Sequence, residues 1–177
     1  DYINITPNQH LRSYALDFDG MDDYAEVTGI SYPENLTIEA WIKPENFDNI
    51  QEIVYLYGDH GVQLRLNNDF ILFGESANGN WNYIVSEPGK VYLNQWNHVA
   101  VTKELDQVNL YINGVQVANT VFDNNPLVSN MTIGARSNAM DRFFEGAIDE
   151  VRIWTEARSQ ADIRANMTSY LTGSETN

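Results

Sequence analysis

Short apolar stretches, separated by Gly, Asn, Asp and Pro, run along most of the chain. Each stretch has the length of an ordinary β-strand, and the residues between them are those that favour turns. In order, the stretches are YALDF, YAEV, LTIEAWIK, EIVYLY, VQLRL, FILFG, NYIVS, WNHVAVT, VNLYI, VQVAN, MTIGA and AIDEVRIW. Their spacing predicts an all-β fold, either an antiparallel two-sheet sandwich or a barrel.

The clearest local signal is a hairpin in the segment VNLYINGVQVAN. The Asn-Gly dipeptide at 113–114 suits a two-residue turn that needs positive φ at both positions. Pairing outward from this turn places Ile112 opposite Val115, and Leu110 opposite Val117. One face of the hairpin is then apolar, as a pair of strands facing a core requires.

The stretch LTIEAWIK predicts a strand with two different faces. By alternation, Ile38, Ala40 and Ile42 form an apolar face. The other face mixes polar and aromatic side chains, so it is not an ordinary solvent face; it carries Thr37, Glu39, Trp41 and Lys43. Aromatic side chains within predicted strands are assigned to packing, together with one buried histidine: Trp41, Trp96, Trp154 and His98.

The stretch GAIDEVRIW raises a question about charge. Alternation places Asp149 on the same face as Val151 and Ile153, with Ile148 on the opposite face. An ionised Asp at the edge of an apolar layer costs several kcal/mol unless a cation or hydrogen-bond donors compensate it.

Only the segment TEARSQADIRANMTSYL predicts a helix. Ala161, Ile163 and Met167 recur at helical spacing, and either Thr155 or Ser159 serves as the N-cap. We expect a short C-terminal helix of one or two turns.

Both ends of the chain are polar and lack periodicity. Residues 1–13 are interpreted as a linker or N-terminal extension, and residues 169–177 as a C-terminal tail or linker. The segment between them, residues 14–168, is long enough for one sizeable core and is interpreted as a single domain.

Composition narrows the possible chemistry. Ten Lys and Arg against 25 Asp and Glu give a formal net charge of −15, which argues against nucleic acids and anionic membranes as partners. The chain has no cysteine, so disulfides and thiolate-bound metals are excluded and any metal uses oxygen or histidine ligands. No apolar run approaches the roughly 20 residues of a membrane helix, so we expect no membrane insertion.

Six short motifs follow one another between residues 14 and 166: LDFDGMDDYAEV, LTIEAWIKP, QWNHVAVT, LYINGVQV, IGARSN and FFEGAIDEVRIWTEARSQADI. In order and spacing they resemble the laminin-G-like domains of the concanavalin A-like lectin and glucanase superfamily. The resemblance implies a jelly roll of two curved antiparallel sheets, in which the first and last motif strands lie close together. It also implies an extracellular or cell-surface binding role, in adhesion or carbohydrate binding, and often a structural calcium ion.

The resemblance suggests what compensates Asp149. In the turn FDGMDD, Asp19, Asp22 and Asp23 offer carboxylates and Gly20 permits close backbone approach, and calcium is held by oxygen ligands of this kind. If the turn lies beside the start of the AIDEVRIW strand, as the resemblance implies, Asp149 supplies another ligand. The alternative is that these aspartates only make hydrogen bonds within turns.

A sugar site needs an aromatic platform for the apolar face of a ring and a few polar groups for its hydroxyls. The chain from EIVYLY to NYIVS supplies both, and Trp81 sits in a Gly- and Asn-rich loop where burial is not expected. We expect a glycan-binding surface that includes Trp81, Tyr83, Tyr57, His60 and Arg65. The alternative is that Trp81 anchors its loop by folding down onto the sandwich.

Two other segments carry polar side chains between predicted strands. A long loop is expected to supply the rim of the same surface, through Arg136, Asn138, Arg142 and Phe143. The acidic segment 48–52 offers oxygen ligands for a second calcium site, but it is interpreted as a solvated loop.

Catalytic signatures are missing from the sequence. A glycoside hydrolase needs two carboxyl groups that flank the scissile bond, and glucanases of the resembling superfamily carry them at alternate strand positions as ExDxxE. The nearest segment, EGAIDE, has its acids at other offsets, and GxSxG, HExxH, P-loop and GxGxxG motifs do not occur. The domain is therefore interpreted as non-catalytic.

The sequence thus predicts an extracellular binding module for a polysaccharide or other glycan, stabilised by calcium and joined to other domains of a larger parent protein. The alternative is an adhesion, protein-interaction or spacer domain of a surface protein, without a sugar site. The exposure of Trp81 and Tyr83 separates the two interpretations, because only an open ring face can stack on a sugar.

Overall fold

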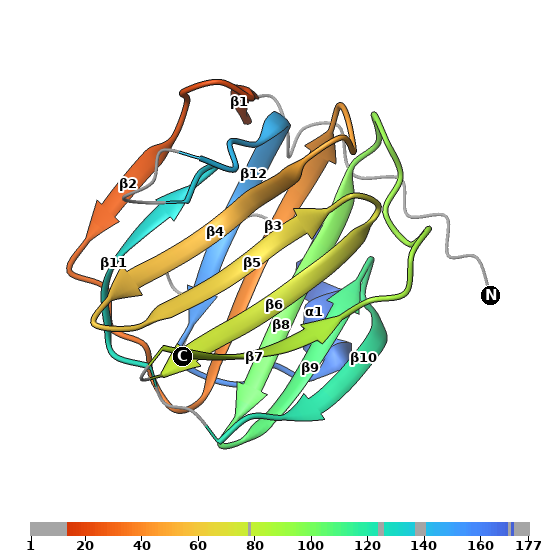
Figure 1. Cartoon of the computed structure of the whole chain (residues 1–177). Helices are drawn as coiled ribbons and strands as arrows, with labels where there is room; N and C mark the ends of the chain where they lie inside the picture. The colour runs from red at the N-terminus through yellow and green to blue at the C-terminus, as the bar shows by residue number, and fades with distance from the viewer. Residues whose placement is uncertain (1–13, 78, 124–125, 137–140, 170, 172–177) are drawn as a thin grey trace.

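The computed structural model describes residues 14–77, 79–123, 126–136, 141–169 and 171. Within these residues, two antiparallel sheets of six strands pack face to face (Figure 1). The first sheet has the order β1 (Leu16–Asp19), β12 (Glu145–Trp154), β3 (Leu36–Pro44), β8 (Asn97–Glu104), β9 (Gln107–Ile112) and β10 (Val115–Val121). The second has the order β2 (Ala25–Thr28), β11 (Val128–Ile133), β4 (Ile50–Gly58), β5 (Gly61–Asn67), β6 (Phe70–Ala77) and β7 (Asn80–Val85). The predicted two-sheet jelly roll is confirmed.

The two ends of the domain pair directly. Strand β12 lies between β1 and β3, with Ile148 opposite both Leu16 and Ile42. The predicted proximity of the first and last motif strands is therefore confirmed. This pairing spans almost the whole described chain, so both ends are held by the same hydrogen-bonded ladder.

The core lies between the two sheets and contains the apolar side chains of both inner faces. Ile38 and Ile42 of β3 belong to the same buried cluster as Val62, Leu64 and Phe73 of the second sheet. Alternate positions along each strand supply these side chains, as a sandwich with two outward faces requires.

Strand β12 departs from the predicted alternation. Its register against β3 shifts between Asp149 and Arg152, where Glu150 has a positive φ of 51°. Because of this bulge, Ile148 and Ile153 both pair with core-facing residues of β3, whereas simple alternation had placed them on opposite faces. Asp149 and Arg152 pair with residues of the other face of β3.

The predicted hairpin is correct at its turn and shifted further out. Val115 pairs with Ile112, but Leu110 pairs with Ala118 instead of Val117. A register shift between Gln116 and Ala118 accounts for the difference. Such a bulge leaves no mark in the apolar and polar pattern, because Val117 and Ala118 are both apolar.

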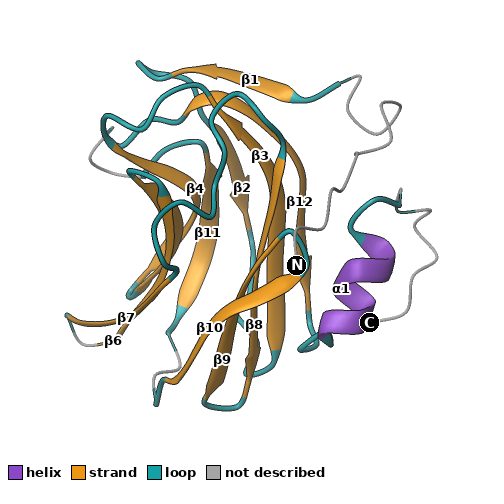
Figure 2. Cartoon of the chain, turned by 90° about the vertical axis from the view of Figure 1, so that its right-hand side faces the viewer, coloured by secondary structure: helices purple, strands orange, loops and turns teal. Residues whose placement is uncertain are grey.

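Helix α1 (Gln160–Asn166) covers the outer face of the first sheet (Figure 2). Ser159 is its N-cap and forms a capping box with Asp162, so the second of the two predicted caps is used. Ile163 is buried against Ala100 and Tyr111 of the sheet. Met167 is also buried, but Ala161 is exposed, so the apolar stripe is narrower than predicted.

A polar network lies on this covered face. The carboxylate of Glu39 accepts a hydrogen bond of 2.9 Å from Trp154 Nε1 and lies 3.3 Å from His98 Nε2 and 3.6 Å from Arg152 Nη1. Burial by itself raises the pKa of Glu39, but the bond and charge of His98, with Trp154 and Arg152, outweigh it and the pKa lies below its ordinary value. The predicted burial of His98 is confirmed, and this Glu and His serve to hold the first sheet together under α1.

Among the described residues, no helix is long and apolar enough to span a lipid bilayer.

Candidate functional site

The outer face of the second sheet carries a small pocket of about 80 Å³. It is lined from β4, β5 and β7 and from the loop between β11 and β12, by Tyr55, Gln63, Arg65, Trp81, Tyr83, Arg136 and Arg142. Strand alternation explains why the residues from β4, β5 and β7 lie together. Each of them alternates along its strand with core-facing residues, so all of their side chains point to the outer surface of the sheet.

Two aromatic rings form one wall of the pocket. Trp81 and Tyr83 are two residues apart on β7, and their rings are nearly parallel, at 4°, with centroids 5.8 Å apart. A Cβ atom on Gly74 would lie 2.6 Å from a Tyr83 ring carbon, and one on Gly61 would lie 3.0 Å from a Trp81 ring carbon. The rings therefore lie close against backbone that bears no side chains. Tyr83 is 47% exposed, so this surface is open to a ligand.

Three arginines surround the aromatic wall. Arg65 lies over the Tyr83 ring, with its guanidinium carbon 5.8 Å from the ring centroid. Arg65 and Arg142 both donate to Gln63 Oε1, at 3.1 Å and 3.3 Å. Arg136 donates to Asp141 at 2.8 Å within the same loop. The shared amide of Gln63 holds two of the guanidinium groups side by side.

A buried carboxyl, Glu52, lies beneath the arginines. It is fully buried, pairs across β4 and β5 with Arg65, and lies 3.6 Å from Arg142 Nη1. Among the described residues, neither of its oxygens accepts a hydrogen bond. Burial raises the pKa of Glu52 to about 8, against the attraction of Arg142, Arg65 and Arg136. Burial therefore raises the pKa of Glu52 by more than the three nearby cations lower it.

The structure brings together four of the six predicted ligand-binding residues, namely Trp81, Tyr83, Arg65 and Arg136. Tyr57 and His60 do not line the pocket. The Tyr57 ring stacks on Tyr55 and its hydroxyl bonds to Glu26, while His60 Nδ1 accepts the backbone N–H of Leu127 at 2.9 Å. Both residues lie at the β4–β5 turn, where local contacts occupy their polar atoms.

Other features of the predicted surface are refined by the structure. Trp81 belongs to strand β7 and not to a loop, so alternation along a strand sets its direction. Of the predicted rim residues, Arg142 lines the pocket, Phe143 lines a neighbouring one, and Asn138 is outside the described residues. Gln63 was missed, although its alternation with Val62 and Leu64 marks it as outward-facing.

The segment 48–52 is the predicted solvated loop only at its start, where Asp48 and Asn49 are exposed before β4 begins. Gln51 and Glu52 belong to strand β4 and are buried, at 1% and 0% exposure. Gln51 donates to Asn46 and accepts from the backbone N–H of Glu145, so both polar atoms of its side-chain amide form hydrogen bonds within the protein. The start of this strand was not predicted because Gln51 and Glu52 are polar, and polar residues next to a turn suggest exposure. In the structure both side chains are buried.

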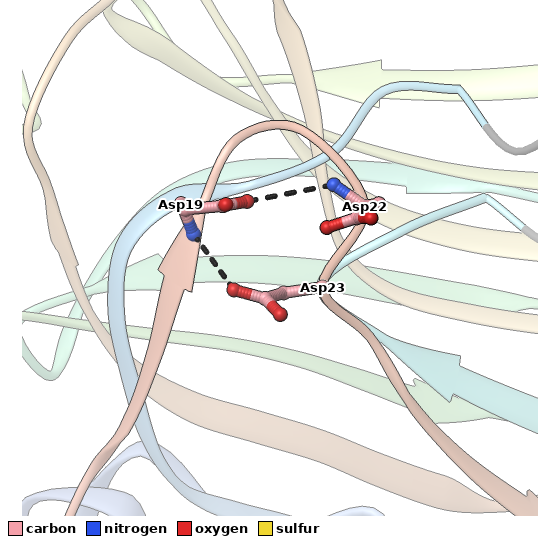
Figure 3. Close-up of side chains that lie close together, drawn as sticks. All are labelled: Asp19, Asp22 and Asp23. Atoms are coloured by element: carbon pink, nitrogen blue, oxygen red, sulfur yellow. Dashed lines mark hydrogen bonds between the residues drawn. The ribbon is translucent and has the colours of Figure 1, made fainter.

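A second group of candidate residues lies in the turn after β1. The carboxylates of Asp19, Asp22 and Asp23 offer oxygens within 4.8 Å of one another (Figure 3). Asp19 Oδ1 accepts the backbone N–H of Met21 at 2.8 Å, and Asp23 Oδ2 accepts that of Asp19 at 3.1 Å. Three exposed carboxylates suit a hard cation, and the same contacts suit an ordinary Asp-rich turn.

Asp149 does not join this group. The residue of β12 that pairs with Asp19 is Glu145, and Asp149 lies four residues further along, opposite Trp41. Its Oδ1 accepts the backbone N–H of Glu150 at 2.8 Å within the bulge. Gly20 does approach β12 closely, because a Cβ on Gly20 would lie 3.0 Å from Glu145 Cβ. The turn therefore lies beside β12, as predicted, but the acidic residue of β12 that lies next to it is Glu145 and not Asp149.

Comparison with known proteins places the chain in a family. The family described as the concanavalin A-like lectin/glucanases superfamily, in its laminin G group, matches residues 19–164. The chain belongs to this family. No curated protein sequence matches the chain.

Several solved structures of other proteins share the fold of this laminin-G-type domain. A putative carbohydrate binding protein from Bacteroides ovatus has a TM-score of 0.71 at 22% identity, over 91% of this chain and 48% of its own. Domain 4 of the arabinanase AbnA from Geobacillus stearothermophilus, in complex with arabinotriose, has a TM-score of 0.68 at 20% identity, covering 85% and 75%. The CBM40 module of a Ruminococcus gnavus sialidase, bound to sialyllactose, has a TM-score of 0.65 at 18% identity, covering 81% and 95%.

The buried carboxyl predicts a characteristic pH dependence of stability. Because the folded pKa of Glu52 is about 8 against an ordinary 4.5, the folded state holds a proton that the unfolded state releases between these values. Its contribution is complete below pH 4.5, declines between pH 4.5 and pH 8 and is lost above pH 8. Glu52→Gln should therefore match the wild type in thermal melts at pH 4 and be more stable at pH 9 by several kcal/mol, since each unit of pKa shift corresponds to about 1.4 kcal/mol. The exposed Glu104→Gln serves as the control, and equal melts of Glu52→Gln and wild type at pH 9 would contradict the assignment.

Proposed function

We propose that this laminin-G-type domain is a non-catalytic carbohydrate-binding module that holds a glycan on the outer face of the second sheet. The observation that carries this proposal is the parallel pair of Trp81 and Tyr83 rings, with Tyr83 exposed and Trp81 half-buried, beside a pocket lined by polar side chains. Two of the structures with the same fold are complexes with sugars, arabinotriose in one and sialyllactose in the other.

The arrangement of the pocket matches what a sugar presents. A pyranose ring has an apolar C–H face and a rim of hydroxyls, so it binds where a flat aromatic surface adjoins hydrogen-bonding groups. The Tyr83 ring supplies the surface, and Gln63, Arg65 and Arg142 supply donors at its edge. The pocket is small, so the bound unit is one or two residues of a longer glycan that continues across the open sheet.

The pocket favours binding over hydrolysis. Hydrolysis by a glycoside hydrolase needs a carboxylic acid and a carboxylate on either side of the bond. Among the described residues that line the pocket or lie directly beneath it, Glu52 is the one carboxyl, and it is covered by the arginines. We therefore propose a role in attaching a larger extracellular or cell-surface protein to a polysaccharide.

We also propose that the turn after β1 binds calcium and stabilises the domain. Asp19, Asp22 and Asp23 provide oxygen ligands of the kind that Ca²⁺ takes. Glu145 of β12 adjoins the turn through Gly20, so an ion held here would strengthen the contact between the first and last strands.

The variant Trp81→Ala tests the aromatic platform. It should weaken binding to the best glycan in an array of polysaccharides by about tenfold or more, since it removes a stacking surface. Isothermal titration measures the loss, and Tyr14→Ala, which removes an exposed ring outside the sheets, is the control. The melting temperature should change by only a few degrees. A collapse of stability would instead identify Trp81 as an anchor, and a blank array would favour the adhesion or spacer role.

Calcium binding is tested by thermal melts with added Ca²⁺ and with a chelator. An ion that binds only the folded state stabilises it by mass action, so saturating Ca²⁺ should raise the melting temperature by several degrees. Asp22→Asn should abolish this response and match the chelated wild type, because the turn bonds accepted by Asp19 and Asp23 remain. Identical wild-type melts with Ca²⁺ and with the chelator would contradict the proposal.

A further inference from the structure

Positive charge is concentrated at the pocket in a strongly acidic protein. The formal net charge is −15, yet three of the ten Lys and Arg residues meet at this one surface, namely Arg65, Arg136 and Arg142. Guanidinium groups repel one another, so bringing them together costs free energy unless anions lie nearby. The anions within the described part of the chain do not fully supply that compensation.

The nearby acids leave much of this charge unbalanced. Asp141 pairs with Arg136 at 2.8 Å. Glu52 lies 3.6 Å from Arg142, beyond hydrogen-bonding distance, and burial raises its pKa, which weakens it as a partner for the arginines. Arg136 is thus the one of the three arginines that forms a hydrogen-bonded ion pair with an acid among the described residues.

The guanidinium groups also retain unused donors. Each carries five N–H bonds in a planar fork. The hydrogen bonds that Arg65 and Arg142 make to described residues both go to the single oxygen of Gln63, and Arg65 Nε is buried without an acceptor. Arg65 and Arg142 both line the pocket, so their other N–H groups can donate to the oxygens of a ligand held there.

We propose that the pocket selects an acidic sugar, whose carboxylate binds between Arg65 and Arg142 while its ring stacks on Tyr83. This inference rests on the proposed glycan-binding function and narrows it to one class of glycan. A planar carboxylate accepts two parallel N–H bonds from a guanidinium, and such charge-assisted bonds are stronger than those to a neutral hydroxyl. Arg65 lies over the Tyr83 ring with its guanidinium carbon 5.8 Å from the ring centroid, so the cation and the aromatic ring are close enough to contact the same sugar residue.

The net negative charge of the protein affects which anions can bind in the pocket. A net charge of −15 repels anions in general. A ligand must therefore gain both from stacking and from the two arginines, and an anion without a sugar ring gains too little. Long-range attraction contributes nothing here, so specificity comes from contacts within the pocket.

The test compares matched sugars that differ only in the acid. Oligosaccharides bearing uronic or sialic acids are titrated into the protein, each beside the same oligosaccharide after reduction of its carboxyl groups to neutral hydroxymethyl groups. The acidic form should bind at least tenfold more tightly than its reduced partner. Arg142→Gln and Arg65→Gln should each remove most of this preference, whereas Arg164→Gln on α1, across the sandwich from the pocket, should keep it.

Each other outcome has a definite meaning. Equal affinity for acidic and reduced forms would overturn the acidic-sugar inference and leave the glycan-binding function standing. Tighter binding of sulfated, carboxyl-free oligosaccharides would overturn the choice of carboxylate. Absence of binding to any acidic or neutral glycan would contradict the proposed function itself. Thermal melts of the arginine variants separate lost binding from lost folding, and Arg142→Gln is the safer variant because its side chain is partly exposed.

Discussion

The candidate site depends on the close packing of two aromatic rings against two glycines. Gly74 pairs directly with Tyr83 across β6 and β7, and a Cβ there would lie 2.6 Å from the ring. With any side chain at that position the ring would have to lift from the sheet. Because it does not, Tyr83 and Trp81 lie parallel, and Arg65 lies over the Tyr83 ring. The positions of the two rings are thus set by the absence of side chains at Gly61 and Gly74.

The arginine cluster is shaped by burial more than by attraction between charges. Glu52 is fully buried. Burial raises its pKa more than the attraction of the three guanidinium groups lowers it. Because burial raises the pKa of Glu52 and no hydrogen bond joins it to Arg142, this carboxyl is a weak partner for the arginines. The pocket therefore keeps guanidinium groups that can bind an external anion. The first sheet shows the opposite balance, since the hydrogen bond from Trp154 and the nearby charges of His98 and Arg152 hold the pKa of Glu39 below its ordinary value in spite of burial.

The sequence was sufficient for the fold and for part of the site, for identifiable reasons. Strand alternation and turn residues predicted the sheets, and an aromatic platform with polar neighbours pointed to Trp81, Tyr83 and Arg65. The bulge in β12 was hidden because Ile148 and Ile153 are both apolar, so either register gives a plausible core. The bulge places Asp149 and Ile153 on opposite faces of the sheet, whereas simple alternation had placed them on the same face. The meeting of Arg142 with Gln63, 79 residues apart, depends on how a loop crosses the second sheet, and periodicity carries no information about that.

Both proposals require that the ligand binds on the outer face of β4, β5 and β7. This is tested by an NMR titration of the isotope-labelled domain with the tightest-binding acidic oligosaccharide, following backbone amides and the Trp indole N–H signals. The largest shifts should occur at Gln63, Arg65, Trp81 and Tyr83, with the Trp41 and Trp154 indoles unchanged under α1. Shifts centred on the Asp19–Asp23 turn or on α1, with the pocket residues unaffected, would contradict both proposals.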